Sequence, residues 1–189
     1  SDTPSLDSSD SLTLETWIKI DADNIDNKSI LIANGGGPTA NYVFFIENNN
    51  LLTFYNGSTH LAGTTALEAE TWYHVAYTND GTTGKIYVNG VLDSESNHTI
   101  GPDTPGNSFS IGNESGHPPT YFQGKLDEVR VWDTARTAEE IAENYNRSLS
   151  GDEANLVGYW NFDEASGKTV YDKTSNNNHG TFAETPQRL

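Results

Sequence analysis

The sequence predicts an all-β protein, a two-sheet antiparallel β-sandwich with one short surface helix. Short segments rich in Val, Ile, Tyr, Phe and Trp recur along most of the chain, as half-buried strands require. Clusters of Asn, Gly and Asp separate these segments and favour tight turns between neighbouring strands. One segment carries the signals of a helix.

The clearest strand signal covers residues 12–20, where apolar and polar side chains alternate. Leu14 and Ile18 lie on one face of the expected strand, and Glu15 and Trp17 lie on the other. The same reasoning predicts strands at residues 29–33, 41–47, 51–56, 71–79, 85–89, 108–112, 125–133 and 156–162.

Two local motifs predict a turn and the helix. Asn89-Gly90 stands between apolar residues, and both residue types tolerate the positive φ of a two-residue β-hairpin turn. Thr137 and Glu140 have the spacing of a capping box, which predicts a helix over about residues 138–147. We interpret residues 1–189 as a single domain, in which residues 163–189 supply closing strands and loops.

The charge of the chain excludes several classes of partner. Lys and Arg number 10 and Asp and Glu number 27, so the formal net charge is −17. A field of this sign repels the phosphates of nucleic acids and the headgroups of anionic lipids. The chain has no Cys, which excludes disulfides, thiolate metal sites and a cysteine nucleophile.

The ends and composition of the chain favour an exported protein. The longest apolar runs, such as residues 42–46, are too short to cross a bilayer, so we expect no membrane insertion. The chain opens on a polar stretch without a signal peptide or an initiator Met, which is typical of a domain cut from a longer chain. The acidic, Asn-rich composition favours a secreted or surface protein of bacterial origin.

Several motifs, in their order along the chain, carry a resemblance to a known family. Residues 15–19, 71–78, 84–90, 124–132 and 158–164 read ETWIK, TWYHVAYT, GKIYVNG, GKLDEVRVW and GYWNFDE. They resemble the laminin-G-like domains of the concanavalin A-like lectin/glucanase superfamily, to which the pentraxins are related. The resemblance implies a jelly-roll sandwich, but this fold hosts lectins, adhesion modules and a few enzymes, so the function must be argued from the site.

The acidic residues of the chain argue against catalysis. Retaining glycoside hydrolysis needs two carboxylates about 5 Å apart. The nearest acidic pair, Asp127 and Glu128, is adjacent within an expected strand, so strand alternation sends the two side chains to opposite faces. The His residues are scattered, with no partner pattern beside them. We therefore expect a protein that is not an enzyme.

One charged trio is expected to be structural. Glu128 and Arg130 share a face of their strand, and Glu15 lies on the polar face of the strand at residues 12–20. We expect Arg130 to bridge Glu15 and Glu128 in a partly buried ion-pair network that locks the two strands together.

The alternative interpretation makes the same face a surface that contacts a glycan. Aromatic rings stack on the C–H face of a sugar for the same reason that they pack in protein cores. The stacking candidates in the strands are Trp17, Tyr73, Tyr77, Tyr87 and Trp132. A loop rich in Gly and Pro adds the ligand-binding candidates Asn113, His117 and Tyr121.

Calcium is the metal that this composition favours, because Ca²⁺ takes oxygen ligands and the chain is rich in Asp and Asn. The family resemblance implies Asp127 as a first ligand, because related sandwiches use an aspartate at this point of the strand. Asp172 and Asn176, in the expected closing loop, are further candidates.

These observations predict a non-catalytic, calcium-binding carbohydrate-recognition module of a larger secreted or surface protein, whose partner is a polysaccharide or a cell-surface glycan. Two alternatives stay open at this stage. One is a protein-binding or spacer module of a bacterial adhesin, and the other is a glycoside hydrolase.

Overall fold

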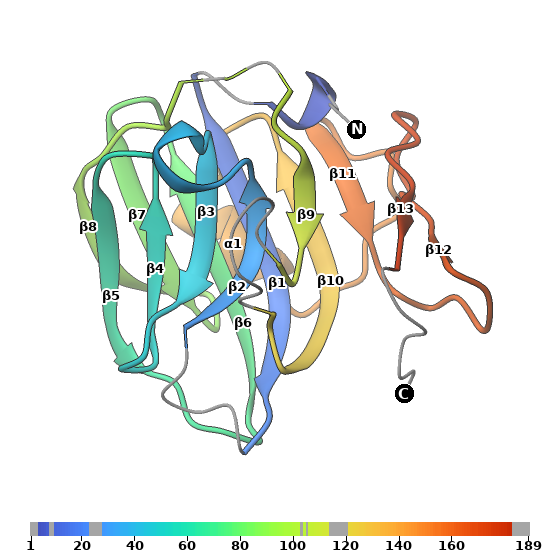
Figure 1. Cartoon of the computed structure of the whole chain (residues 1–189), viewed down its shortest axis with the longest axis horizontal. Helices are drawn as coiled ribbons and strands as arrows, with labels where there is room; N and C mark the ends of the chain where they lie inside the picture. The colour runs from blue at the N-terminus through green and yellow to red at the C-terminus, as the bar shows by residue number, and fades with distance from the viewer. Residues whose placement is uncertain are drawn as a thin grey trace.

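Two antiparallel sheets packed face to face form the body of the protein in a computed structural model, which describes residues 4–7, 10–22, 28–102, 104, 106–113 and 121–182 (Figure 1). The six-stranded sheet has the order β11-β10-β1-β6-β7-β8, and the five-stranded sheet has the order β5-β4-β3-β2-β9. The fold is therefore the predicted two-sheet β-sandwich with one α-helix among the described residues.

The strands of the six-stranded sheet are β1 (Leu12–Ile20), β6 (Trp72–Asn79), β7 (Thr83–Val88), β8 (Val91–Asn97), β10 (Gly124–Trp132) and β11 (Leu156–Trp160). Those of the five-stranded sheet are β2 (Ser29–Asn34), β3 (Tyr42–Ile46), β4 (Leu51–Tyr55), β5 (His60–Ala66) and β9 (Phe109–Ile111). The short strands β12 (Thr169–Val170) and β13 (Gly180–Thr181) pair with each other beside β11, and 3-10 turns lie at Pro4–Leu6 and Gly37–Thr39 (Figure 1).

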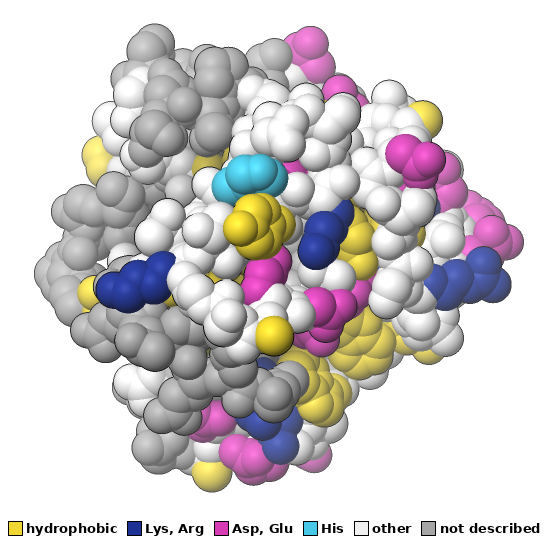
Figure 2. Space-filling model, turned by 90° about the vertical axis from the view of Figure 1, so that its right-hand side faces the viewer, with side chains coloured by type: hydrophobic (Ala, Val, Ile, Leu, Met, Phe, Trp, Pro, Cys, Tyr) yellow, Lys and Arg dark blue, Asp and Glu magenta, His cyan; other side chains and the backbone are white. Residues whose placement is uncertain are grey.

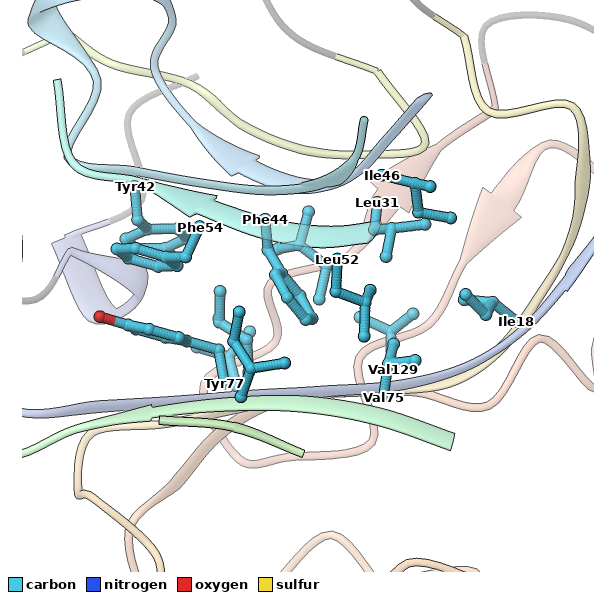
Figure 3. Packing of buried hydrophobic residues seen from close by; sticks show 14 of the residues in the cluster. Ile18, Leu31, Tyr42, Phe44, Ile46, Leu52, Phe54, Val75, Tyr77 and Val129 are labelled. Atoms are coloured by element: carbon cyan, nitrogen blue, oxygen red, sulfur yellow. The ribbon is translucent and has the colours of Figure 1, made fainter. Parts of the chain in front are cut away.

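The core lies between the two sheets and is built from the apolar face of each strand (Figure 3). Leu14 and Ile18 of β1 point into it, as the alternation at residues 12–20 predicts. The ring of Tyr77 stacks on that of Phe54 across the sandwich, with their centroids 3.5 Å apart. Burial of such large rings removes much apolar surface from water and is the main stabilising contribution.

The predicted hairpin is confirmed. Asn89 and Gly90 join β7 to β8 with φ values of 49° and 79°, the left-handed conformations that the turn requires. The backbone N–H of Asn89 also donates to the carbonyl oxygen of His74, which ties the turn to β6.

The helix α1 (Ala138–Asn144) begins at the predicted capping box. The N–H of Glu140 donates to the Thr137 hydroxyl at 3.2 Å, and the N–H of Thr137 donates to the Glu140 carboxylate at 2.8 Å. Ile141 is buried against Ala76 and Tyr87, so α1 covers the face of the six-stranded sheet that points away from the core. No helix in the described part of the chain has the length and apolar character needed to cross a membrane.

Candidate functional site

A β-bulge interrupts the pairing of β1 with β10. Trp17 faces Asp127 and Glu15 faces Arg130, so β10 contains one more residue than β1 over this stretch. Glu128 has a backbone φ of 51° there, in the left-handed region that a non-glycine residue adopts only under local constraint. The bulge breaks the alternation, and the prediction that Asp127 and Glu128 point to opposite faces is wrong, because both line one cleft.

This cleft has a volume of about 340 Å³ and opens on the outer face of the six-stranded sheet. Two tryptophans, three carboxylates and a short segment that follows α1 form its walls. The lining residues are Trp17, Trp72, Asp127, Glu128, Asn146, Arg147, Ser148 and Asp163. We call this site the Trp–carboxylate cleft.

The two tryptophans of the cleft differ in exposure. Trp72, at the start of β6, is 37% exposed, whereas Trp17 is half-buried. The indole N–H of Trp17 donates to the backbone carbonyl of Tyr145 at 2.9 Å, and its ring lies edge-on to the His74 ring. One ring is thus fixed by the protein, and the other offers free apolar surface at the rim.

The carboxylates make the cleft electronegative. Burial raises the pKa of Asp127 above its ordinary value, and the neighbouring charges of Glu128 and Asp163 raise it further. Asp163 is exposed and accepts a hydrogen bond from the Asn161 amide at 2.7 Å. Acidic side chains also lie at several places on the side of the molecule that carries β12 and β13 (Figure 2).

A buried charged cluster lies beside the cleft, beneath α1. Glu15 is fully buried, and its carboxylate lies 3.2 Å from His74 Nε2, 3.8 Å from Arg130 and 3.8 Å from Arg136. Burial alone would raise the pKa of Glu15, but His74 and the two guanidinium groups hold it below its ordinary value. Arg136 in turn stacks on the Trp132 ring, 4.0 Å from its centroid.

The structure places the predicted trio together. Arg130 donates to the Glu128 carboxylate at 2.7 Å and lies within ion-pair distance of Glu15. The same guanidinium donates to the backbone carbonyls of Asn144 and Arg147, two contacts that the sequence did not predict. Arg130 therefore also holds the segment that follows α1.

That segment, residues 145–148, is one wall of the cleft. Its position depends on three side chains of the sheet, because Trp17 and Arg130 both donate to its carbonyl oxygens and Tyr145 packs against His74. The sequence analysis missed His74 and Arg136. The spacing in residues 71–79 could have found His74, because alternation places it on the same face as Trp72.

Most of the predicted stacking residues lie elsewhere. Tyr77 is in the core, Tyr87 is covered by α1, and Trp132 is covered by Arg136. Tyr73 is half-buried and packs against the core. These four rings offer no platform for a sugar. Strand alternation selected them because it does not distinguish an exposed ring from one that the core, a helix or a loop covers.

Trp17 is the one predicted strand aromatic that lines the cleft. Trp72 was not among the candidates, although it stands at the outward-facing start of a predicted strand. Of the loop candidates, Tyr121 is 55% exposed, and the Asn113 carbonyl accepts a hydrogen bond from the Ser110 hydroxyl. His117 lies outside the described residues.

The predicted calcium ligands lie in separate places. Asp172 is buried, and its carboxylate accepts four hydrogen bonds, at 2.8–3.0 Å, from the N–H groups of Tyr159, Thr174 and Asn178 and the hydroxyl of Thr174. The Asn176 side chain donates to the Val157 carbonyl. These contacts hold the closing loop against β11.

The Asp127 carboxylate offers oxygen ligands of the kind that Ca²⁺ takes. Two other carboxylates line the same cleft. Among the described residues, no group of three or more His, Asp or Glu side chains is arranged to hold a metal ion. Calcium at Asp127 stays a prediction.

Comparison with known proteins identifies the family. The profile of the concanavalin A-like lectin/glucanases superfamily, Laminin_G_3, matches residues 1–142. The chain belongs to this superfamily, as its motifs predict. No curated protein sequence matches the chain.

Solved structures share the fold. A candidate carbohydrate-binding protein from Bacteroides ovatus ATCC 8483 is 26% identical with a TM-score of 0.76, and the match covers 93% of this chain and 55% of that one. This chain therefore spans about half the length of that protein.

Two further structures are more distant. Domain 4 of an extracellular arabinanase from Geobacillus stearothermophilus, in complex with arabinotriose, is 20% identical with a TM-score of 0.58, over 74% of this chain and 68% of that one. A Ruminococcus gnavus sialidase CBM40 domain bound to α2,3 sialyllactose is 16% identical with a TM-score of 0.61, over 74% and 84%. At these identities the likeness shows the fold alone.

Proposed function

We propose that this domain is a non-catalytic carbohydrate-binding module and that the glycan binds in the Trp–carboxylate cleft. The observation that carries the proposal is the meeting of Trp17 and Trp72 with three carboxylates in one open cleft. An exposed indole face stacks on the apolar face of a sugar ring, and carboxylates accept hydrogen bonds from its hydroxyls.

The comparisons support this proposal at the level of the module. Among the similar structures are a candidate carbohydrate-binding protein, an arabinanase domain in complex with arabinotriose and a CBM40 domain bound to sialyllactose. We propose a polysaccharide or a cell-surface glycan as the ligand, and a larger secreted or surface protein of bacterial origin as the parent of the module.

The test is a glycan array with the purified domain, followed by titration calorimetry on the glycans that bind. Trp72→Ala should weaken binding about tenfold or more, because the exposed ring provides stacking area and does not support the core. Tyr171→Ala is the matched control, since this ring is 49% exposed and lies outside the cleft.

Two results would contradict the proposal. Loss of binding in Tyr121→Ala with full binding in Trp72→Ala would move the site to the loop. A folded domain that binds no glycan on the array would favour the spacer or protein-binding module.

A glycoside hydrolase is the second candidate, because the bulge brings Asp127 and Glu128 into one cleft and burial raises the pKa of Asp127. Against it, the Glu128 carboxylate already accepts hydrogen bonds from Arg130 and from the Tyr159 hydroxyl at 2.9 Å. Glu128 thus serves the structural ion pair with Arg130. Release of reducing sugar from a bound glycan, abolished in Asp127→Asn, would establish the hydrolase.

A further inference from the structure

We infer that the Trp–carboxylate cleft selects glycans whose sugars carry no acidic group, and excludes those that carry carboxylate or sulfate. This inference rests on the proposed function, and it names the ligand class of the same site.

The charges that line the cleft are mostly negative. Asp127, Glu128 and Asp163 oppose one cation, Arg147, whose side chain is exposed. The buried Arg130 pairs with Glu128. In the described part of the chain, no ion pair joins Asp127 or Asp163 to a Lys or an Arg. Two carboxylates thus lie without an ion-pair partner at the place where a sugar would lie.

The hydrogen-bonding chemistry of the cleft leads to the same ligand class. An ionised carboxylate only accepts hydrogen bonds, so its natural partners on a glycan are hydroxyl donors. A carboxylate or sulfate on the glycan would bring a second acceptor against Asp127 or Asp163. It would add charge repulsion and leave those oxygens without a donor.

The exposed Arg147 does not reverse this preference. Arg147 belongs to the segment that follows α1, and Arg130 holds this segment by donating to the backbone carbonyl of Arg147. One guanidinium stands against three carboxylates in the same lining, so the net charge of the cleft stays negative. The net charge of −17 acts in the same direction on a polyanionic polysaccharide, and one bound Ca²⁺ would leave −15.

The experiment compares matched neutral and acidic probes. Titration calorimetry is carried out with lactose against 3′-sialyllactose, with galactan against polygalacturonate, and with the best neutral glycan from the array against its sulfated form. Each pair is measured at low and high salt, and in chelator and in millimolar Ca²⁺, because a cation at Asp127 would reduce the repulsion.

We expect each neutral probe that binds to bind at least about tenfold more tightly than its acidic partner at low salt, with a smaller ratio at high salt. The variant Asp127→Asn/Asp163→Asn should reduce that ratio, because it removes both uncompensated charges while keeping the side-chain size. Trp72→Ala should weaken both members of a pair equally.

Tighter binding of the acidic member of a pair, in chelator or in Ca²⁺, would overturn the inference and leave the proposed function intact. Acidic binding that Arg147→Ala abolishes would overturn it in the same way and would identify Arg147 as the anion site. If no probe and no array glycan binds the folded domain, the proposed function fails, and the inference fails with it.

Discussion

The guanidinium group of Arg130, on β10, donates a hydrogen bond to the backbone carbonyl of Asn144 at the end of α1, 3.2 Å away. The same group is 1% exposed and pairs with Glu128. One buried side chain thus connects the sheet, the helix and the wall of the Trp–carboxylate cleft. Stability and ligand binding are therefore expected to depend on the same residue.

Arg130→Ala should reduce the free energy of unfolding by about 2–4 kcal/mol, because it leaves Glu15 buried with less positive charge and two carbonyls without their donor. It should also weaken glycan binding, since residues 145–148 lose a support. Urea unfolding and calorimetry measure the two effects. Lys85→Ala is the control, because its pair with Glu95 is exposed and contributes little. A loss below about 0.5 kcal/mol in Arg130→Ala would mean that the cluster is solvated.

Glu15→Gln should make the free energy of unfolding less dependent on pH in the acid range. The folded-state pKa of Glu15 lies below its ordinary value of 4.5, so its charge stabilises the fold above that pH, and this stability is lost as the pH falls through the folded pKa. We therefore expect the variant to lose about 3 kcal/mol at neutral pH. The difference from the wild type should shrink below pH 4.5. Chemical unfolding across this pH range measures it, and a difference that stays constant with pH would contradict the assigned charge state.

Much of the fold follows from the sequence, because alternation reports which face of a strand is buried. Residues 12–20 form β1 over the predicted range. The edge strand β5 was missed, since His60–Ala66 is mostly exposed and has Leu61 as its one large apolar side chain, so it shows no apolar alternation.

The candidate site was harder to predict. The residue types at Asp127 and Glu128 do not predict a bulge, because the register depends on how β10 pairs with β1. Tyr87 was misplaced because a helix from distant sequence covers it, and Trp132 because Arg136, just after the strand, folds back over its ring.

Calcium, if it binds at Asp127, should raise the melting temperature by several degrees in millimolar Ca²⁺, because a ligand that binds only the folded state stabilises it. The cation would also offset the repulsion among Asp127, Glu128 and Asp163. Asp127→Asn should abolish the shift. Differential scanning calorimetry with Ca²⁺ and with chelator decides this, and identical melting curves in the two buffers would count against calcium.

Asp172→Ala separates a structural role from a metal-binding role at the second calcium candidate. The buried carboxylate accepts hydrogen bonds from Tyr159, Thr174 and Asn178, so its removal leaves several donors unsatisfied and should cost about 2–4 kcal/mol. Because these partners are all protein groups, the loss should be equal in chelator and in Ca²⁺, and glycan binding should be retained. Chemical unfolding in both buffers measures the loss. A deficit that disappears in chelator would show instead that Asp172 stabilises the protein through a bound cation.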